Sequence, residues 1–226
     1  MRIKYGVLII GLIFLVSGCY ENITGTVVDD ETEKPIEGAV VLVEFDVTKG
    51  LPGLSYTDRY KAFETVTGKE GKFILSGVLN PFVNPPQLVI YKRGYVAWRE
   101  YATFPDYKER KDFKWQNGSI FRLERFKRGY LHTRHTSFIG TGIGSLGIVS
   151  SKLDQAHSWE RPLASKEVDL YSKKRDSLKP SEKALIYPSS YPLKHNAMQR
   201  RKEIYNRIWQ EVIQELYFPE KENRNE

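Results

Sequence analysis

Alternating apolar and polar positions begin at Ile23 and indicate a β-strand. In ITGTVV, Ile23 and Val27 alternate with threonines, which is the two-residue period of a strand with one buried face. A polar turn containing Pro35 and Gly38 follows, and the β-branched run AVVLVEFD after it predicts a second strand. The chain is therefore expected to be β-rich from Ile23 onward.

Five further segments have the short, apolar composition of strands. They are AFETVT (62–67), GKFILSG (71–77), QLVIYK (87–92), YVAWREY (95–101) and SIFRLERF (119–126). Tight turns are expected at GKEG (68–71) and KRG (92–94). About seven short strands separated by turns are typical of an antiparallel β-sandwich. Gly38 and Gly71 are expected to supply turn conformations that other residues resist.

The strand pattern stops after Phe126, and residues 127–226 are expected to form a mostly helical, irregular region. Four prolines limit helix length in its middle part: Pro162, Pro180, Pro188 and Pro192. Between Asn196 and Pro219, helical spacing places six residues near one face: Met198, Tyr205, Ile208, Trp209, Val212 and Leu216. This face is expected to pack within the protein, and docking on a membrane or partner is the alternative.

The N-terminal segment has the organisation of a signal peptide. Arg2 and Lys4 precede an apolar run that ends at Val16, and two small residues follow. The run is shorter than the about 20 apolar residues that a membrane-spanning helix needs. Residues 1–18 are therefore expected to be a cleaved signal.

The chain has one cysteine, Cys19, directly after this segment. VSGC, at 16–19, resembles the lipobox of bacterial lipoproteins. The resemblance implies cleavage before Cys19, a diacylglyceryl group on its sulfur and an acylated amine, so that lipid on Cys19 holds the protein on a membrane. The alternative is an ordinary secreted protein.

Residues 19–22 would form the lipidated N-terminus and a short tether. Between the cysteine and the first strand, three residues reach about 10 Å at most. Tyr20 stands where an aspartate would resemble an inner-membrane retention signal, which favours the outer membrane of a two-membrane bacterium.

Three motifs resemble the carboxypeptidase regulatory-like domain. They are I-x-G-x-V-x-D at Ile23–Asp29, T-x-x-P-I-x-G-A at Thr32–Ala39 and T-x-x-x-G-x-F at Thr67–Phe73. The resemblance implies a non-catalytic, seven-stranded antiparallel β-sandwich of transthyretin-like (prealbumin-like) type over residues 23–126. Two departures are the long insertion VTKGLPGLSYTDRYK (47–61) and the proline-rich loop LNPFVNPPQ (79–87).

Charge is distributed unevenly within a total of +7. Residues 20–102 carry nine Lys and Arg against twelve Asp and Glu, whereas 103–226 carry 24 against 16. Basic charge often indicates nucleic-acid binding, but export across a membrane argues against such a partner. The densest basic stretch, RLERFKRGYLHTR (122–134), is suited to anionic lipid or glycan, and a solvated face is the alternative.

Candidate contact residues follow from exposure and charge, because exposed loops carry binding more often than strands do. They are Tyr56 and Tyr60 in the insertion, and Arg125, Lys127, Arg128 and Arg134 in the basic stretch. The partner would be an envelope protein, an anionic lipid or a glycan.

Three motifs resemble cofactor or metal sites, but the sequence around each argues against that assignment. GIGSLG (142–147) lacks the βαβ context of a dinucleotide site. His132 and His135 have no carboxylate or third histidine convincingly near them in sequence. His157 and Glu160 match H-x-x-E of metallocarboxypeptidases, but that enzyme needs a large mixed sheet. No catalytic residue, metal or cofactor is therefore expected.

Taken together, the patterns favour a membrane-anchored, non-catalytic lipoprotein of the cell envelope that acts as a binding or assembly module. One alternative is an enzyme, or an enzyme subunit, that acts on cell-wall or polysaccharide substrate through the C-terminal region. A purely structural spacer is another.

Overall fold

The computed structural model describes residues 19–51, 53–140, 151–187 and 195–219, which fall into two compact units. Unit 1 contains the described residues up to Phe126 and those of Phe138–Ser158, and unit 2 contains Lys127–Ser137 and the described residues from Trp159 onward. The expected division at Phe126 is incomplete, because residues 138–140 and 151–158 also belong to the first unit. The predicted signal peptide and GIGSLG lie outside the described residues.

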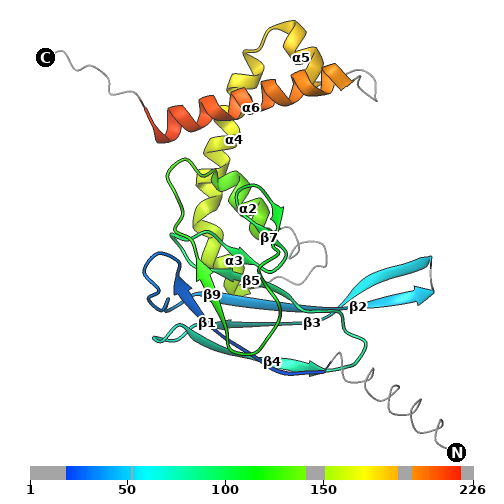
Figure 1. Cartoon of the computed structure of the whole chain (residues 1–226). Helices are drawn as coiled ribbons and strands as arrows, with labels where there is room; N and C mark the ends of the chain where they lie inside the picture. The colour runs from blue at the N-terminus through cyan, green and yellow to red at the C-terminus, as the bar shows by residue number, and fades with distance from the viewer. Residues whose placement is uncertain (1–18, 52, 141–150, 188–194, 220–226) are drawn as a thin grey trace, which may run out of the picture. The chain divides into compact units, whose positions relative to one another are not determined.

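Unit 1 contains nine strands among its described residues, arranged in three sheets (Figure 1). One sheet has the order β4 (Lys72–Leu79), β1 (Cys19–Asp29), β9 (Ser119–Leu123). A second has the order β3 (Leu54–Val66), β2 (Val40–Leu51), β5 (Gln87–Tyr91), β6 (Trp98–Arg99). The third pairs β7 (Ala102–Thr103) with β8 (Lys108–Glu109).

The β-rich fold predicted for this part of the chain is confirmed, but two details differ. The described strands number nine rather than seven. In addition, β1 and β9 pair in parallel, from Gly25 opposite Ser119 to Asp29 opposite Leu123, so the expectation of a wholly antiparallel sandwich is wrong at this pair. Parallel pairing requires a long crossover connection, which local periodicity does not reveal.

The insertion at 47–61 is part of a long β-hairpin. β2 pairs with β3 along its whole length, from Val40 opposite Val66 to Leu51 opposite Leu54. The register shifts once, between Phe45 and Asp46. The insertion contains one Val, two Thr and two Tyr, residue types that favour strands. The segment expected to depart from a plain hairpin therefore extends the two strands as a paired arm.

The main core of unit 1 contains side chains from both larger sheets. The three-stranded sheet contributes Ile23, Val27, Phe73, Leu75, Phe121 and Leu123, and the four-stranded sheet contributes Val41, Val43, Phe45, Leu88, Ile90 and Trp98. Gly25 lies among them, and a Cβ there would lie 2.4 Å from the Phe121 ring. Absence of a side chain at Gly25 thus allows the rings of Phe73 and Phe121 to pack 5.7 Å apart.

From Val40 to Phe45, strand β2 is buried on both faces, because a helix covers its second face. Helix α3 (Ser151–His157) packs on β2 and β5, and Leu153 is 1% exposed. The amides of Lys152 and Leu153 donate to the carboxylate of Glu64 at 3.3 and 3.1 Å. The cover that α3 provides therefore explains why AVVLVEF is apolar without alternation.

Unit 2 is helical, as predicted for the C-terminal region. Its described elements are most of α2 (His132–Gly140), all but the first residue of η1 (Ser158–Glu160), α4 (Arg161–Asp176), α5 (Pro180–Ile186) and α6 (His195–Tyr217). Ile208, Trp209 and Val212 are buried in its core, as expected from the amphipathic pattern. Met198 and Tyr205 are exposed instead, and Ile204 takes a core position.

Candidate functional site

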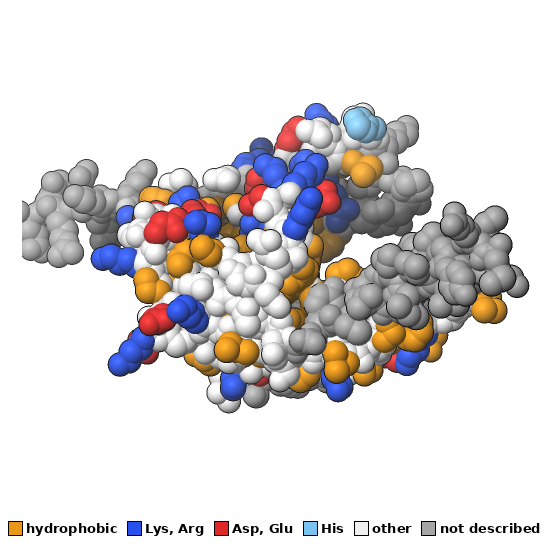
Figure 2. All heavy atoms as spheres, turned by 60° about the horizontal axis from the view of Figure 1, so that its bottom comes forward, with side chains coloured by type: hydrophobic (Ala, Val, Ile, Leu, Met, Phe, Trp, Pro, Cys, Tyr) orange, Lys and Arg blue, Asp and Glu red, His pale blue; other side chains and the backbone are white. Residues whose placement is uncertain are grey.

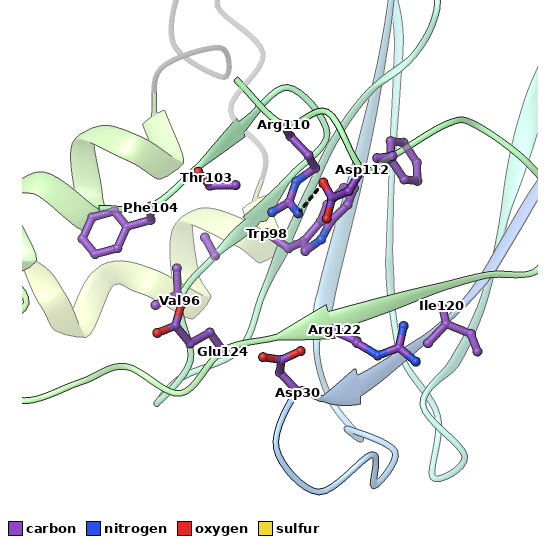
Figure 3. A pocket seen from close by; sticks show the side chains of 12 residues that line it. Asp30, Val96, Trp98, Thr103, Phe104, Arg110, Asp112, Ile120, Arg122 and Glu124 are labelled. Carbon is purple, nitrogen blue, oxygen red and sulfur yellow. Dashed lines mark hydrogen bonds and ion pairs between the residues drawn. The ribbon is translucent and has the colours of Figure 1, made fainter. Parts of the chain in front are cut away.

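A pocket of about 370 Å³ lies in unit 1 among segments that are far apart in sequence (Figure 3). Its lining comes from the end of β1, from the chain around β6 and β7, from the loop at 110–113 and from β9. Twelve residues line it: Asp30, Val96, Ala97, Trp98, Thr103, Phe104, Arg110, Asp112, Phe113, Ile120, Arg122 and Glu124. The volume lies in the range of small-molecule sites, about 300–1,000 Å³.

Aromatic packing holds the floor of the pocket in place. The indole of Trp98 is buried and meets the rings of Phe113 and Phe121 edge-on, each with centroids 4.9 Å apart. Phe121 belongs to the main core. Because Trp98 and Phe121 are core residues, we expect this floor to be rigid and apolar.

One charged group lies directly beside the floor. The guanidinium of Arg110 is 4.6 Å from the centroid of the Trp98 ring. Its Nε donates to the carbonyl of Arg99 at 2.7 Å, and its Nη1 donates to Asp112 Oδ1 at 3.4 Å. Burial lowers the pKa of Arg110, although an arginine remains charged at neutral pH. These contacts fix a cation at the mouth of the pocket.

A second charged row lies along β9 and the end of β1. Arg122 makes a bidentate ion pair with Glu33, at 2.8 and 3.1 Å. Figure 3 shows Asp30 and Arg122 on this side and the linked Arg110 and Asp112 on the other. Ile120 adds an exposed apolar side chain next to Arg122.

The lining therefore combines an apolar floor with a mixed rim of two arginines and three carboxylates. Asp30 and Asp112 present exposed acceptors, and the guanidinium groups present donors. Because the rim is nearly balanced in charge, it favours a hydroxyl-rich, ring-shaped ligand over a strongly anionic one. Such a ligand would place its hydroxyls on the rim and its apolar face against the exposed side chain of Ile120.

The candidate tyrosines of the insertion lie outside the pocket. Tyr56 and Tyr60 are both on β3 and are 61% and 41% exposed. Both side chains are accessible, but they lie on a strand and not in the exposed loop that the sequence analysis expected. Cys19 is the first residue of β1, where it pairs with Leu79 of β4.

The basic candidates are divided between the two units. Arg125 belongs to unit 1, where its Nη2 lies 2.7 Å from Asp29 Oδ2. Arg128 belongs to unit 2, where its Nε donates to the carbonyl of Tyr217 and its guanidinium lies 4.8 Å from the Phe218 ring. Contacts inside the units thus occupy both arginines.

Two further basic candidates lie in unit 2 with different exposure. Lys127 is exposed, whereas Arg134 is half-buried on α2. Lys127, like Arg125 and Arg128, is therefore accessible, and Arg134 is less accessible than these three.

The histidines in HTRH have a carboxylate partner that the sequence analysis did not expect. Nδ1 of His132 and Nδ1 of His135 each lie 2.9 Å from Oε2 of Glu160, whose side chain is 1% exposed. His157 is in unit 1, and its Nδ1 lies 2.6 Å from the carbonyl of Leu153. The H-x-x-E pair is therefore split, and its glutamate joins η1 to α2.

A second buried carboxylate caps the start of α2. Glu167 accepts hydrogen bonds at 2.8 Å from the amides of His132 and Thr133, and another from the Tyr217 hydroxyl. A carboxylate at a helix N-terminus satisfies free amides and the helix dipole. Burial and the hydrogen bond to Glu167 raise the pKa of Tyr217. The two carboxylates thus organise unit 2 rather than face an opening.

The described part of the chain contains neither a metal-binding cluster nor a membrane-spanning helix. No group of three His, Cys, Asp or Glu side chains there is arranged to hold a metal ion. Nor is any helix there both long and apolar enough to span a bilayer.

The pocket residues were missed by sequence reasoning because they have no common motif. Trp98 was assigned to a strand, and the segment KERKDFKWQNG (108–118) was assigned no role. The available signal was the presence of Phe113 and Trp115 within an otherwise charged loop. Large aromatics in such a context often pack on a core or line a site.

No protein-family model matches the chain, and no curated protein matches it. Among solved structures, a streptococcal ancillary pilin matches with 18% identity over 48% of this chain and 30% of the pilin chain, at a TM-score of 0.24. A 9R-lipoxygenase from Cyanothece PCC8801 matches with 12% identity over 90% of this chain and 33% of its own, at 0.25. This chain thus spans about a third of the length of either structure, and neither likeness bears on its function.

Proposed function

We propose that this protein is a non-catalytic binding module of the bacterial cell envelope, anchored by lipid on Cys19. Its β-rich unit would be a carboxypeptidase regulatory-like domain of the transthyretin-like type. The two larger sheets support this assignment because together they contain seven strands that share one core. Tyr20 after the cysteine supports the outer membrane as the location.

The observation that carries the proposed binding function is the pocket over Trp98. It combines a rigid aromatic floor with carboxylate acceptors from Asp30 and Asp112 and a fixed donor from Arg110. The acceptors and the donor suit the hydroxyl groups of a sugar ring, and the exposed Ile120 side chain beside them suits its apolar face. A cell-envelope glycan is therefore the proposed ligand class.

Binding can be tested by NMR titration of the full chain with soluble muropeptides and chito-oligosaccharides. We expect the Trp98 indole and Ile120 methyl signals to shift with saturation. Asp30→Ala and Asp112→Ala should each weaken binding by about fivefold, because each removes a net hydrogen bond of about 1 kcal/mol. Glu109→Ala is the matched control, because Glu109 is an exposed carboxylate on β8 outside the pocket lining.

Three results would contradict this proposal. Saturable shifts that are equal in the Asp112→Ala and wild-type proteins would place the binding elsewhere. Cleavage of the added oligosaccharide would identify an enzyme instead. A Cys19 peptide from the native envelope whose mass lacks acyl chains would remove the membrane anchor from the proposal.

A further inference from the structure

Five strongly exposed, large apolar side chains of unit 1 lie near the tip of the β2–β3 hairpin or at and after the end of β4. Their exposed fractions are 72% for Leu51, 81% for Leu54, 61% for Tyr56, 76% for Leu79 and 77% for Phe82. Scattered exposed apolar residues need no explanation, whereas a group of them marks an interaction surface. These five residues are termed the apolar edge below.

Strand directions place the whole apolar edge at one end of unit 1. β4 ends at Leu79, opposite Cys19 at the start of the antiparallel β1. β2 begins at the other end, where Gly71 and Ile36 bond to Val27, and it ends at Leu51. Figure 1 shows the tip of the β2–β3 hairpin and the start of β1 on the same side of the sheets.

A bridge ties the two parts of the apolar edge together. Val47 on the hairpin pairs with Val83, the residue after Phe82. The amide of Asn84 donates to the carbonyl of Asp46 at 2.9 Å. The turn that carries Phe82 is thus fixed against the base of the hairpin arm.

The arm projects beyond the core that supports it. Val47 is the last buried residue of β2, and residues 48–51 are all exposed. Four residues extend about 14 Å along a strand. A two-stranded ribbon without a covered face is only marginally stable in water, so contact with an apolar phase would stabilise this arm.

Polarity along the arm follows the profile of a membrane interface. The tip carries Leu51 and Leu54, and Tyr56 follows, a residue type that favours the headgroup level. Behind them, Lys49 and Asp58 form an exposed ion pair at 2.6 Å. A bilayer surface accommodates this arrangement, in which apolar side chains lie at the tip and charged side chains lie closer to the body of unit 1. In Figure 2, exposed hydrophobic side chains are scattered among charged and other side chains over the visible face.

The geometry points to a second membrane contact: the apolar edge inserts into the same leaflet of the bilayer that holds the lipid on Cys19. This inference rests on the proposed lipidation, because Cys19 lies opposite Leu79 within the edge. Lipid and inserted side chains would then fix the orientation of unit 1 on the membrane. A lipid chain alone would leave it free to rotate about the anchor.

Depth-dependent quenching tests this inference directly. Cys19 is the only cysteine, so acylation leaves the lipidated full chain without a thiol. Leu54→Cys, Phe82→Cys and Val66→Cys would each be labelled with bimane and reconstituted in vesicles of phosphatidylethanolamine and phosphatidylglycerol containing brominated lipid. Val66 is the control, because it is exposed but lies opposite Val40 at the far end of β3.

We expect labels at 54 and 82 to be quenched at least about threefold more than the label at 66, because inserted groups reach about 5–10 Å into the interface. Equal quenching at all three positions, on protein that floats with the vesicles, would overturn the inference. Protection of the label at 54 that depends on protein concentration, and not on vesicles, would also overturn it by identifying contact between copies.

A double variant separates this inference from lipidation. Leu51→Ser with Leu54→Ser should leave the acyl mass and vesicle flotation unchanged while the label at 82 loses most of its quenching. Ile74→Ser, at an exposed position on β4 away from the edge, should preserve that quenching. Unchanged quenching in the double variant would contradict insertion through the hairpin. Loss of acyl mass or flotation in the wild-type chain would instead contradict the anchor.

Discussion

The guanidinium of Arg99 donates a 2.8 Å hydrogen bond to the carbonyl of Phe138, although the two residues are 39 positions apart. Arg99 is 1% exposed and stacks on Tyr101, with its guanidinium carbon 4.6 Å from the ring centroid. Burial lowers the pKa of Arg99. A buried cation thus connects β6 to the segment that returns to unit 1.

Replacing this cation tests its role in holding the returning segment. Arg99→Met should destabilise unit 1 by about 2 kcal/mol, because the Phe138 carbonyl loses a buried donor. Hydrogen exchange should accelerate in α3 before it accelerates in β1. Lys69→Met, at an exposed cation in the turn before β4, is the control for charge. Exchange in α3 that is unchanged from the wild type would contradict this role.

Glu167 provides a second test, located in unit 2. Its carboxylate accepts from the amides of His132 and Thr133 and from the Tyr217 hydroxyl. Glu167→Gln replaces one acceptor oxygen with a donor, so we expect a loss of about 2–3 kcal/mol. Tyr217→Phe removes only one of four donors, because the Thr133 hydroxyl also donates to Glu167, and should cost about 1 kcal/mol. Urea unfolding, together with hydrogen exchange at the α2 amides, measures the loss of stability in each variant. Equal losses would contradict the expectation that Glu167→Gln costs more than Tyr217→Phe.

Local sequence patterns predicted the elements better than their partners. The alternation at Ile23 and the helical spacing around Ile208 identified elements that the structure contains. Periodicity reports which side of an element is apolar, but not which distant element covers it. The parallel pairing of Gly25 with Ser119 and the covering of β2 by α3 therefore had no local signal.

The candidate sites were harder to predict for the same reason. Glu160 lies 25 positions after His135, and the sequence analysis found no carboxylate convincingly placed near the histidines. The pocket similarly depends on folding, which brings Asp30, Trp98 and Arg122 from three separate segments into one lining. Such constellations arise from tertiary packing, whereas turn glycines are local. Gly38 and Gly71 were accordingly predicted correctly, and their φ values are +72° and +69°.

Acid sensitivity of unit 1 is expected to depend on Asp29. Burial would raise the pKa of its carboxyl group, but hydrogen bonds from Tyr95, Thr32 and Glu31 outweigh it and lower the pKa to about 2. The ordinary value is 3.8. The pKa of Asp29 is thus lower in the folded than in the unfolded state. Its ionised carboxylate therefore stabilises the fold fully at pH values above the unfolded-state pKa, and this stabilisation is lost as pH falls toward 2.

The measurement is urea unfolding of unit 1 as a function of pH. Stability of the wild type should fall between about pH 4 and pH 2, and Asp29→Asn should flatten this part of the profile while lowering stability at neutral pH. Asp30→Asn, at the exposed neighbouring carboxylate, should retain the acid-dependent fall. An acid limb that is the same in Asp29→Asn and in the wild type would show that other groups cause it.

Two glycines in left-handed conformations allow backbone strain to be separated from crowding. Gly71 has φ +69°, and a Cβ there would lie 2.3 Å from the carbonyl oxygen of Val27. Gly94 has φ +88°, and no heavy atom lies within 4 Å of its Cβ position. Gly94→Ala should therefore cost only the conformational strain of about 1–2 kcal/mol.

Gly71→Ala should cost about 3 kcal/mol or more, because the β1 backbone must also move. That carbonyl of Val27 accepts the amide of Ile36, and the amide of Val27 donates to Gly71. The substitution would therefore disturb two backbone bonds at the start of the first turn. Thermal unfolding of both variants measures the difference. Equal destabilisation would mean that strain alone accounts for the glycine at 71 and that the close approach to Val27 relaxes without cost.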